Sequence, residues 1–348
     1  MKKFPIYILL FLLASSCFQN TTDTSGSNSE SKGVVNIYTD RHYPIDDSIY
    51  LTFEKEYGIK VNVVKGKSED LLSRIKKEGS STKADLLITA DVGRLHQAKE
   101  AQFFQAIDTP EELVNVSPYL YDEENYWFGL TKRARIIVYS NDRVDKKDLS
   151  TYEALTDKKW KGRLAIRSKE NVYNQSLLAS IIIANGEDSS YNWVKGMVKN
   201  MYQSPKGNDR DQVKAIYAGK ADVAIVNTYY VGKMLNSDDQ QERKAAESVS
   251  VFYPNQSGRG SHINISGGGV LRHSKNKNNA EKLLNYLLTN EVQELFSKAN
   301  FEFPVNRNVS ISEQVLAWGD FKEDSVKLSE IGKYNTAAIK LFDKGGWK

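Results

Sequence analysis

Tyrosine is the residue type whose placement in this sequence most clearly indicates chemistry. The chain holds 19 tyrosines against 13 phenylalanines, and several come soon after apolar segments with the pattern of β-strands. They are Tyr43 after 34–38, Tyr173 after 163–167, and the adjacent Tyr229 and Tyr230 after 221–226. In α/β proteins, ligands bind at the carboxyl ends of the strands. The four phenols are therefore predicted to converge in a cleft, with Tyr43 on one wall and the other three opposite.

A cluster of phenols favours a strongly Lewis-acidic metal ion. The phenolate is a hard oxygen ligand, but an unperturbed tyrosine has a pKa near ~10. Only an ion that competes well with the proton holds several phenolates at neutral pH, and Fe(III) is the biologically abundant ion of that kind. Calcium and magnesium sites call for carboxylates, and zinc sites for histidine or cysteine.

Each of these tyrosines also has a simpler interpretation. A single tyrosine after a strand is most often a packing residue whose hydroxyl reaches water, and adjacent aromatic residues at a helix start occur in ordinary cores. His42, next to Tyr43, is by itself more typical of a surface or hydrogen-bonding histidine than of a metal ligand. Residue types and spacing alone therefore leave both a metal site and ordinary packing open.

No other motif matches a known catalytic or cofactor site. Gly66-Lys67-Ser68 would need a glycine five residues earlier to form a phosphate-binding loop, and that position is Val61. The three glycines of 267–269 match neither the dinucleotide fingerprint nor the hydrolase elbow. The four histidines are scattered, and a single cysteine excludes thiolate zinc and iron–sulfur sites. An enzyme built on serine or paired carboxylates stays open, because such sites assemble in space.

The elements that would position these residues alternate along the chain from residue 34. Strand candidates are 34–38, 60–64, 84–89, 134–140, 163–167, 221–226, 249–253 and 262–265. Helical periods lie at 46–57, 69–78, 91–101, 174–185, 209–219, 279–288 and 290–299. Strands separated by helices predict an α/β fold with parallel sheets. Candidate crossovers near 131–134 and 258–269 divide the chain into lobe 1, 34–132 plus 265–348, and lobe 2, 133–264. A helical C-terminal segment, 311–343, is expected to pack on lobe 1.

Composition narrows the class of protein. A chain of 348 residues is long enough for two or three compact units. Hydrophobic residues make up 40% and charged residues 26%, which excludes a disordered chain. Lysine and arginine number 48 against 44 acidic residues, and a surplus of +4 is too small to indicate a nucleic-acid-binding surface.

The first 33 residues are predicted to direct the export of the protein and to tether it to a membrane. Lys2 and Lys3 precede an apolar stretch, 4–14, which has the size of a signal-peptide core and is too short to span a bilayer. Small residues then lead to Cys17, the only cysteine, which predicts a lipoprotein signal over 1–17; a plain signal peptide with an incidental cysteine is the alternative. The polar segment 18–33 is typical of a flexible tether. The working part is thus expected to be exported, periplasmic or at the cell surface, with a lipid anchor at its N-terminus.

Five segments resemble the ferric-iron substrate-binding proteins of bacterial ABC importers. They are Ile37-Tyr-Thr-Asp-Arg-His-Tyr43, Ala84-Asp-Leu-Leu-Ile-Thr-Ala-Asp91, Thr131-Lys-Arg-Ala-Arg-Ile-Ile-Val-Tyr139, Val226-Asn-Thr-Tyr-Tyr230, and the tail from His262-Ile-Asn-Ile-Ser-Gly-Gly-Gly-Val270 through Phe303-Pro-Val305. The match runs from about 34 to 345, nearly the whole chain after the tether. The His-Tyr and Tyr-Tyr motifs, with Tyr173 between them, are the specific part of the resemblance.

This resemblance implies a fold, a cargo and a set of ligands. The fold is a two-lobed, transferrin-like periplasmic-binding-protein fold of type 2, with a hinge and a central cleft that closes on one Fe(III). Tyr43, Tyr173, Tyr229 and Tyr230 would supply phenolates and His42 an imidazole, with an anion or water completing the shell. Arg133 would offset the phenolate charge nearby, and Lys233 stands where relatives often carry arginine. The partners implied are an ABC permease and its ATPase, served by a monomer that binds no nucleic acid.

Two other classes of function remain open at this point. The first is a binding protein of the same architecture for an organic or oxyanion ligand, such as a polyamine, a sugar acid or sulfate. Such a ligand calls for carboxylates with aromatic residues, or for helix N-termini with hydroxyls, and the Tyr-Tyr pair argues against it. The second is an exported enzyme, which the missing histidine and cysteine constellations disfavour.

Overall fold

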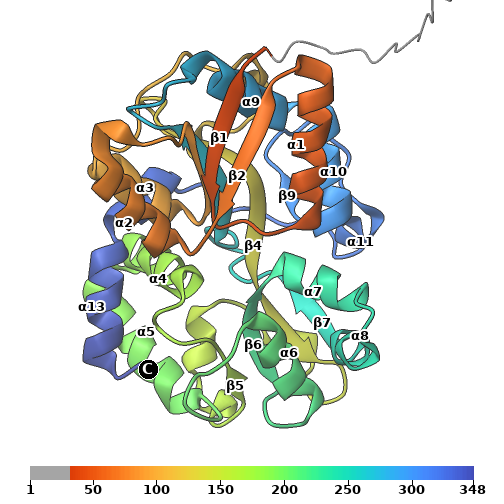
Figure 1. Cartoon of the computed structure of the whole chain (residues 1–348). Helices are drawn as coiled ribbons and strands as arrows, with labels where there is room; N and C mark the ends of the chain where they lie inside the picture. Colours follow the sequence, from red (N-terminus) through yellow and green to blue (C-terminus); the bar gives the residue numbers. More distant parts are fainter. Residues whose placement is uncertain (1–31) are drawn as a thin grey trace, which may run out of the picture. The chain divides into compact units, whose positions relative to one another are not determined.

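A computed structural model of the protein describes residues 32–348 as one compact unit (Figure 1). The predicted signal segment with Cys17, and all but the last two residues of the predicted tether, lie outside these residues. Across residues 32–348, every helix is too short or too polar to span a bilayer.

The strands form a single twisted sheet. They are β1 Val34–Thr39, β2 Lys60–Lys65, β3 Leu86–Ala90, β4 Phe128–Ser140, β5 Leu164–Ala165, β6 Val223–Asn227, β7 Val249–Phe252, β8 Ile263–Val270 and β9 Phe303–Pro304. Their order is β2-β1-β3-β8-β4-β6-β5, and β7 and β9 both pair with β4. The central positions of β3, β4 and β6 are almost wholly buried, which explains their continuous apolar sequences.

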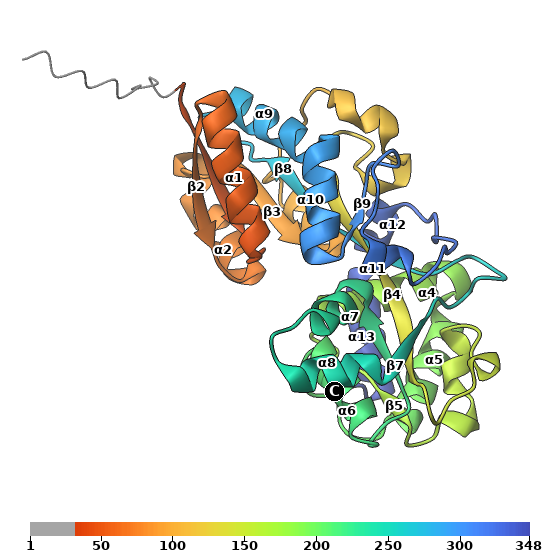
Figure 2. The same ribbon diagram turned by 90° about the vertical axis from the view of Figure 1, so that its right-hand side faces the viewer.

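The long strand β4 joins two parts of this sheet (Figures 1 and 2). From Phe128 to Ala134 it pairs with β8, and from Arg135 to Tyr139 it pairs with β6. The first part of the sheet, with β1, β2, β3, β8 and β9, lies above the second part, with β5, β6 and β7, in Figure 1. A single strand thus crosses from one part to the other at residues 134–135.

The prediction of parallel sheets is correct only in part. The pairs β1–β2, β1–β3 and β5–β6 are parallel, whereas β8 runs antiparallel to β3 and β4, and β4 runs antiparallel to β6 and β7. The three glycines at 267–269 lie inside β8, where neighbouring strands approach closely. A Cβ atom at Gly267 would stand 2.6 Å from the carbonyl oxygen of Phe128. The glycines therefore allow the neighbouring strands to pack closely.

Helices cover the sheet and include three that the sequence did not predict. The helices are α1 Pro44–Tyr57, α2 Ser68–Glu78, α3 Val92–Glu100, α4 Val172–Asn185, α5 Glu187–Asn200, α6 Asp209–Tyr217, α7 Thr228–Leu235, α8 Gln240–Glu247, α9 Lys277–Leu288, α10 Asn290–Asn300, α11 Glu313–Leu316, α12 Leu328–Lys333 and α13 Asn335–Gly345. The unpredicted helices are α5, α7 and α8. Helix α8 buries two alanines, Ala245 and Ala246, and has no large apolar residue that would reveal its period. Helix α7 follows β6 without a turn residue between them.

The C-terminal segment packs on lobe 1 only in part, because α12 packs against α3 as expected but α13 does not. It is broken into α11, α12 and α13, and α13 packs against α4 and α5, beside the second part of the sheet. Trp347 is 1% exposed and contacts Trp193 and Phe342, and its indole nitrogen donates to the carbonyl oxygen of Arg167. Burial of these aromatic rings explains why residues 335–347 lie with lobe 2.

We expect Trp347→Ala to destabilise the protein by about 3–5 kcal/mol, because it empties a fully buried site between α5 and α13. Leu316→Ala is the control, since Leu316 is 53% exposed and its loss should cost within about 0.5 kcal/mol. Urea unfolding followed by circular dichroism measures both. Equal stabilities of the two variants would contradict this packing.

Candidate metal centre

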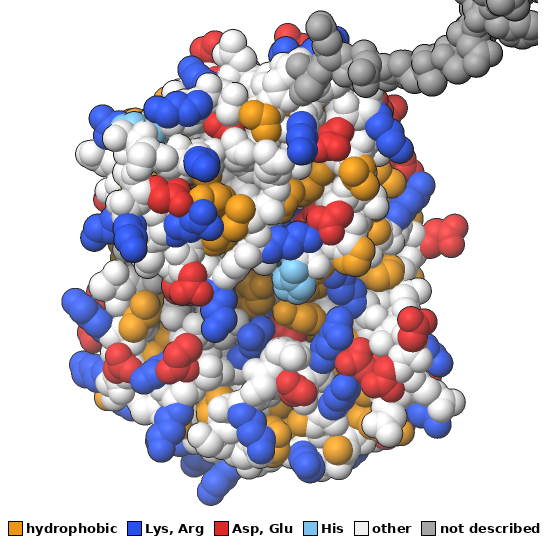
Figure 3. Space-filling view, viewed as in Figure 1, with side chains coloured by type: hydrophobic (Ala, Val, Ile, Leu, Met, Phe, Trp, Pro, Cys, Tyr) orange, Lys and Arg blue, Asp and Glu red, His pale blue; other side chains and the backbone are white. Residues whose placement is uncertain are grey.

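A cleft of about 1250 Å³ lies between the two parts of the sheet. Its walls include His42, Tyr43, Tyr173 and Tyr230, and basic residues such as Arg167. On the face shown in Figure 3, lysine and arginine side chains gather around a recess at mid-height. The structure therefore presents a concave site in which phenol and basic groups meet.

The four tyrosines named from the sequence come together at this cleft. The hydroxyl oxygens of Tyr173 and Tyr229 are 3.3 Å apart. The ring of Tyr229 stacks on that of Tyr230, with centroids 4.3 Å apart, and meets the Tyr43 ring edge-on at 6.4 Å. Residues separated by up to 187 positions in the chain thus form one phenol cluster, consisting of Tyr43, Tyr173, Tyr229 and Tyr230.

Each tyrosine lies at the amino-terminal end of a helix that follows a strand. Tyr43 immediately precedes α1, Tyr173 lies in the first turn of α4, and Tyr229 and Tyr230 lie in the first turn of α7. The sequence placed the pair Tyr229-Tyr230 after a strand, but its helix was not predicted. The amino-terminal ends of helices carry partial positive charge, which favours the phenolate form of a nearby tyrosine.

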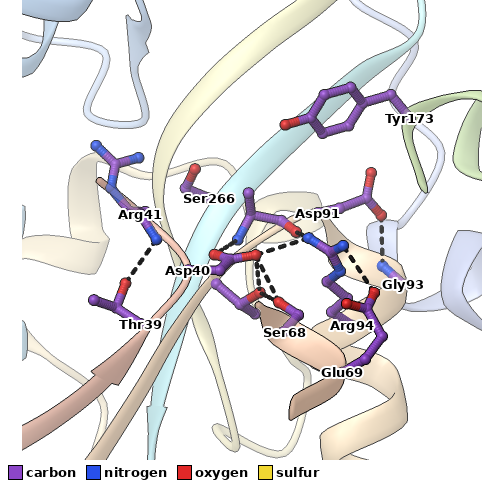
Figure 4. Close-up of polar contacts among 12 residues, drawn as sticks. Thr39, Asp40, Arg41, Ser68, Glu69, Asp91, Gly93, Arg94, Tyr173 and Ser266 are labelled. Atoms are coloured by element: carbon purple, nitrogen blue, oxygen red, sulfur yellow. Dashed lines mark hydrogen bonds and ion pairs between the residues drawn. The ribbon is translucent and has the colours of Figure 1, made fainter. Parts of the chain in front are cut away.

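Asp40 fixes the segment that carries His42 and Tyr43 (Figure 4). Its carboxylate accepts hydrogen bonds from Ser68 Oγ at 2.6 Å, from the backbone nitrogen of Ala90 at 2.9 Å, and from the Arg94 guanidinium at 2.7 Å. These partners come from α2, β3 and α3. The turn after β1 is therefore tied to three neighbouring elements, which limits where Tyr43 can point.

A buried ion-pair group supports the same segment from the other side. The Arg41 guanidinium donates to Asp46 at 2.9 Å and to Glu302 at 3.2 Å, and all three residues are at most 4% exposed. Burial alone would raise the pKa of Glu302, but Arg41 holds that pKa below its usual value. The carbon at the centre of the guanidinium lies 4.9 Å from the centre of the Tyr43 ring.

Three phenols of the cluster strongly favour the neutral form when no cation is bound. Burial, then the negative charge of Glu302, raises the pKa of Tyr43 well above its ordinary value. Burial and the neighbouring phenols of Tyr173 and Tyr230 do the same for the pKa of Tyr229. The pKa of Tyr230 is raised to about 12 by burial, by Tyr173 and by Asp209. An ion that binds these oxygens must displace their protons.

Guanidinium groups surround Tyr173. The central carbons of Arg133, Arg135 and Arg167 lie 5.2, 5.9 and 5.7 Å from the centre of its ring. Arg133 is 1% exposed, and its Nε and one terminal nitrogen have no hydrogen-bond partner in the described part of the chain. Such buried, unpaired donors are suited to an anionic neighbour. Arg133, predicted from the sequence to offset phenolate charge, is thus placed beside the phenol cluster.

His42 and Lys233 lie at the margin of the cluster. The His42 side chain is exposed, its ring centroid is 5.2 Å from that of Tyr43, and its Nδ1 lies 3.3 Å from the backbone oxygen of Asp40. The Lys233 ammonium lies 3.4 Å from the centre of the Tyr43 ring. Burial, together with Arg41 and Arg210, lowers the pKa of Lys233 to about 8. Lys233, on α7, therefore lies over the ring of Tyr43.

Several residues of this centre were not predicted. Arg135 could have been found, because it is two residues from Arg133 and the alternation of β4 places both on one face. Glu302, Asp209 and Arg167 carry no local signal, since their relation to the tyrosines arises only in the fold. No three histidine, cysteine, aspartate or glutamate side chains in residues 32–348 are grouped so that they could hold a metal ion. The oxygens that converge at this cleft belong to the phenol groups of the tyrosines.

Comparison with known proteins places the fold and the cleft in a family. Residues 49–323 match the bacterial extracellular solute-binding proteins, and the chain belongs to this family. It is 43% identical over 340 residues to iron uptake protein A1 of Synechocystis, covering 97% of this chain and 93% of that protein. These matches confirm the family resemblance noted in the sequence.

Solved structures agree with this placement. Trichodesmium FutA (IdiA), in complex with iron and citrate, superposes with a TM-score of 0.88 at 44% identity, over 91% of this chain and 100% of that one. The ferric binding protein from Campylobacter jejuni superposes with a TM-score of 0.86 at 38% identity, over 90% of this chain and 100% of that one. The predicted two-lobed α/β binding-protein fold is confirmed.

We expect Tyr230 in the metal-free protein to remain protonated through pH 11, because its pKa is raised to about 12. Below that value the neutral phenol predominates, so the ultraviolet difference between wild type and Tyr230→Phe at pH 11 should show only a minor phenolate band, about a tenth of full ionisation. In the unfolded protein the same difference should show ionisation near ~10. Ionisation of Tyr230 near pH 10 in the folded protein would contradict the burial described here.

Proposed function

We propose that this protein captures Fe(III) in the cleft through tyrosine phenolates and delivers it to an ABC importer. The observation that carries this proposal is the convergence of four phenols at helix amino termini, ringed by buried guanidinium groups. The ligands proposed are the phenolates of Tyr43, Tyr173, Tyr229 and Tyr230, with the His42 imidazole beside them. The iron-uptake and ferric-binding relatives support this cargo.

Charge balance favours a trivalent ion. Three or four phenolates around Fe(III) sum to a net charge of zero or −1, which the unpaired guanidinium of Arg133 can offset. A divalent ion with the same ligands would leave one more negative charge in a buried site. The Trichodesmium relative in complex with iron and citrate supports an anion or water as the group that completes the shell.

The division of the ligands between the two parts of the sheet couples capture to closure. Tyr43 and His42 come from the proposed lobe 1, 34–132 plus 265–348, whose last helix α13 packs on lobe 2. The other three tyrosines come from the proposed lobe 2, 133–264. Binding would then draw the lobes together in a hinge transition, and the closed form would dock on the permease that works with its ATPase. The role is transport of cargo by a monomer rather than catalysis.

The proposal also includes the location of the protein in the cell. The family is one of extracellular solute-binding proteins, and the predicted leader ends at Cys17. We propose that a lipid on Cys17 anchors the exported protein to a membrane, with 18–33 as the tether. Release of the protein into the soluble fraction by Cys17→Ser, with export unchanged, would support this anchor.

Titration of the purified protein with chelated ferric iron should produce a saturable charge-transfer colour at one iron per chain. Phenolate bound to Fe(III) gives this band, whereas histidine and carboxylate ligands do not. Tyr229→Phe combined with Tyr230→Phe should abolish the colour and weaken binding by more than the ~10–100-fold typical of residues that only orient ligands. Circular dichroism should show an intact fold, because only two hydroxyls are removed.

Tyr191→Phe is the matched control for that titration. Tyr191 lies on α5, outside the cleft, and its ring contacts Lys195 and Lys344. Its loss should leave colour and affinity unchanged. Unchanged iron affinity in the double variant would refute the ligand assignment, and a colourless wild type would shift the proposal to an organic or oxyanion ligand.

Iron affinity should fall as the pH falls. The raised pKa values of Tyr43, Tyr229 and Tyr230 keep these phenols protonated at neutral pH, so each phenolate ligand that forms releases one proton. Loading should therefore release about three to four protons per iron, and Tyr229→Phe should release about one fewer. A pH indicator in weakly buffered solution measures this release, after subtraction of the protons that the freed chelator takes up, measured separately. Loading without proton release would exclude phenolate ligation.

A further inference from the structure

A buried ion pair lies directly behind the phenol cluster in the second part of the sheet. The Arg135 guanidinium on β4 donates to the Asp209 carboxylate at the start of α6, with a nitrogen–oxygen distance of 2.8 Å. The side chains are 1% and 0% exposed. A pair this deeply buried gains little net stability over apolar residues of similar size. Its contribution to the protein is therefore the position of the groups that it contacts.

One arm of this pair reaches the segment that carries Tyr173. A second nitrogen of Arg135 donates to the side-chain oxygen of Asn174 at 2.8 Å, and Asn174 is the residue after Tyr173. The amide of Asn174 in turn donates to the backbone oxygens of Arg167 and Ser168, at 2.8 and 3.1 Å. The first turn of α4 and the loop before it are thus fastened to β4 through one guanidinium.

The other arm reaches the segment that carries Tyr229 and Tyr230. The oxygen of Asp209 that accepts from Arg135 also accepts from the backbone nitrogen of Asn227, at 2.8 Å. Asn227 is the residue before α7, two positions from Tyr229. The second carboxylate oxygen of Asp209 lies 3.4 Å from the Arg167 guanidinium, which faces Tyr173. One carboxylate therefore links the starts of α6 and α7 with the loop before α4.

We infer that Arg135 and Asp209 form a positioning pair that sets the distance between Tyr173 and the Tyr229-Tyr230 pair before iron arrives. This inference rests on the proposed ferric site. Neither residue needs to touch the metal, because each acts through Asn174, Asn227 and the backbone to which they belong. The 3.3 Å separation of the Tyr173 and Tyr229 hydroxyls is then a consequence of the pair, and three of the four phenols are already in position on one lobe.

The chain offers a matched control for a test of this pair. Asp222 also sits between two arginines, Arg143 and Arg163, in the same part of the sheet. It holds β4, β5 and their loops together, and it contacts none of the segments that carry the four tyrosines. Asp209→Asn and Asp222→Asn therefore both remove a carboxylate charge from an arginine pair, but only the first acts on the phenol cluster.

The test is to titrate purified wild type, Asp209→Asn and Asp222→Asn with chelated ferric iron, and to record affinity, the charge-transfer band and the thermal midpoint. We expect Asp209→Asn to weaken iron binding by about 10–100-fold and to shift or broaden the band, because the phenolates no longer meet the ion at fixed positions. Asp222→Asn should lower the thermal midpoint and leave affinity and band as in wild type.

Asn174→Ala provides a second route to the same answer. It removes the partner of Arg135 on α4 without changing any charge, so it should also weaken iron binding and alter the charge-transfer band. If Asp209→Asn does not fold, this variant alone tests the positioning role. Wild-type affinity and band in folded Asp209→Asn, or in Asn174→Ala, would overturn the positioning role. So would equal losses of affinity in Asp209→Asn and Asp222→Asn. A colourless wild type would instead refute the ferric site itself, and the positioning role with it.

Discussion

Charge compensation is the constraint on which this cleft depends. In the proposed ferric site, phenolates a few ångströms apart repel one another, so they are stable together only near groups of positive charge. Arg133, Arg135 and Arg167 supply that charge around one ring. A buried guanidinium needs its own partners, and this need explains why carboxylates such as Asp209 are buried a few ångströms behind the tyrosines. The buried ion pairs are therefore needed because the phenol oxygens at the cleft require arginines beside them.

The parts of this arrangement that follow local rules could be predicted from the sequence. The α/β class, most strands and the longer amphipathic helices are visible as periodic apolar patterns. The tyrosines could be placed at one cleft because the loops after strands open on the same edge of a sheet. Helix α7 was missed although it carries two of the tyrosines, since eight residues that begin directly after β6 offer neither a turn signal nor several helical periods.

The remaining parts depend on pairings that no local pattern encodes. The antiparallel insertion of β8 between β3 and β4 places residues 263–270 beside segments about 130–180 positions earlier in the chain. The relation of Glu302 to Arg41 spans 261 residues, and that of Asp209 to Arg135 spans 74. A carboxylate at the start of an amphipathic helix or next to a short strand is usually solvated. Only the three-dimensional fold distinguishes these carboxylates from the many that face water.

The guanidinium groups around Tyr173 also limit how far such a cleft can be redesigned. Exchanging the tyrosines for aspartate or glutamate would supply the oxygens that calcium prefers, but the arginines would remain a few ångströms away. New carboxylates would then pair with these arginines before they could bind a divalent ion. If the tyrosines are the proposed ligands, a change of cargo requires the arginines behind the cleft to change together with them. The preference for a particular ion is then a property of β4 as much as of the loops.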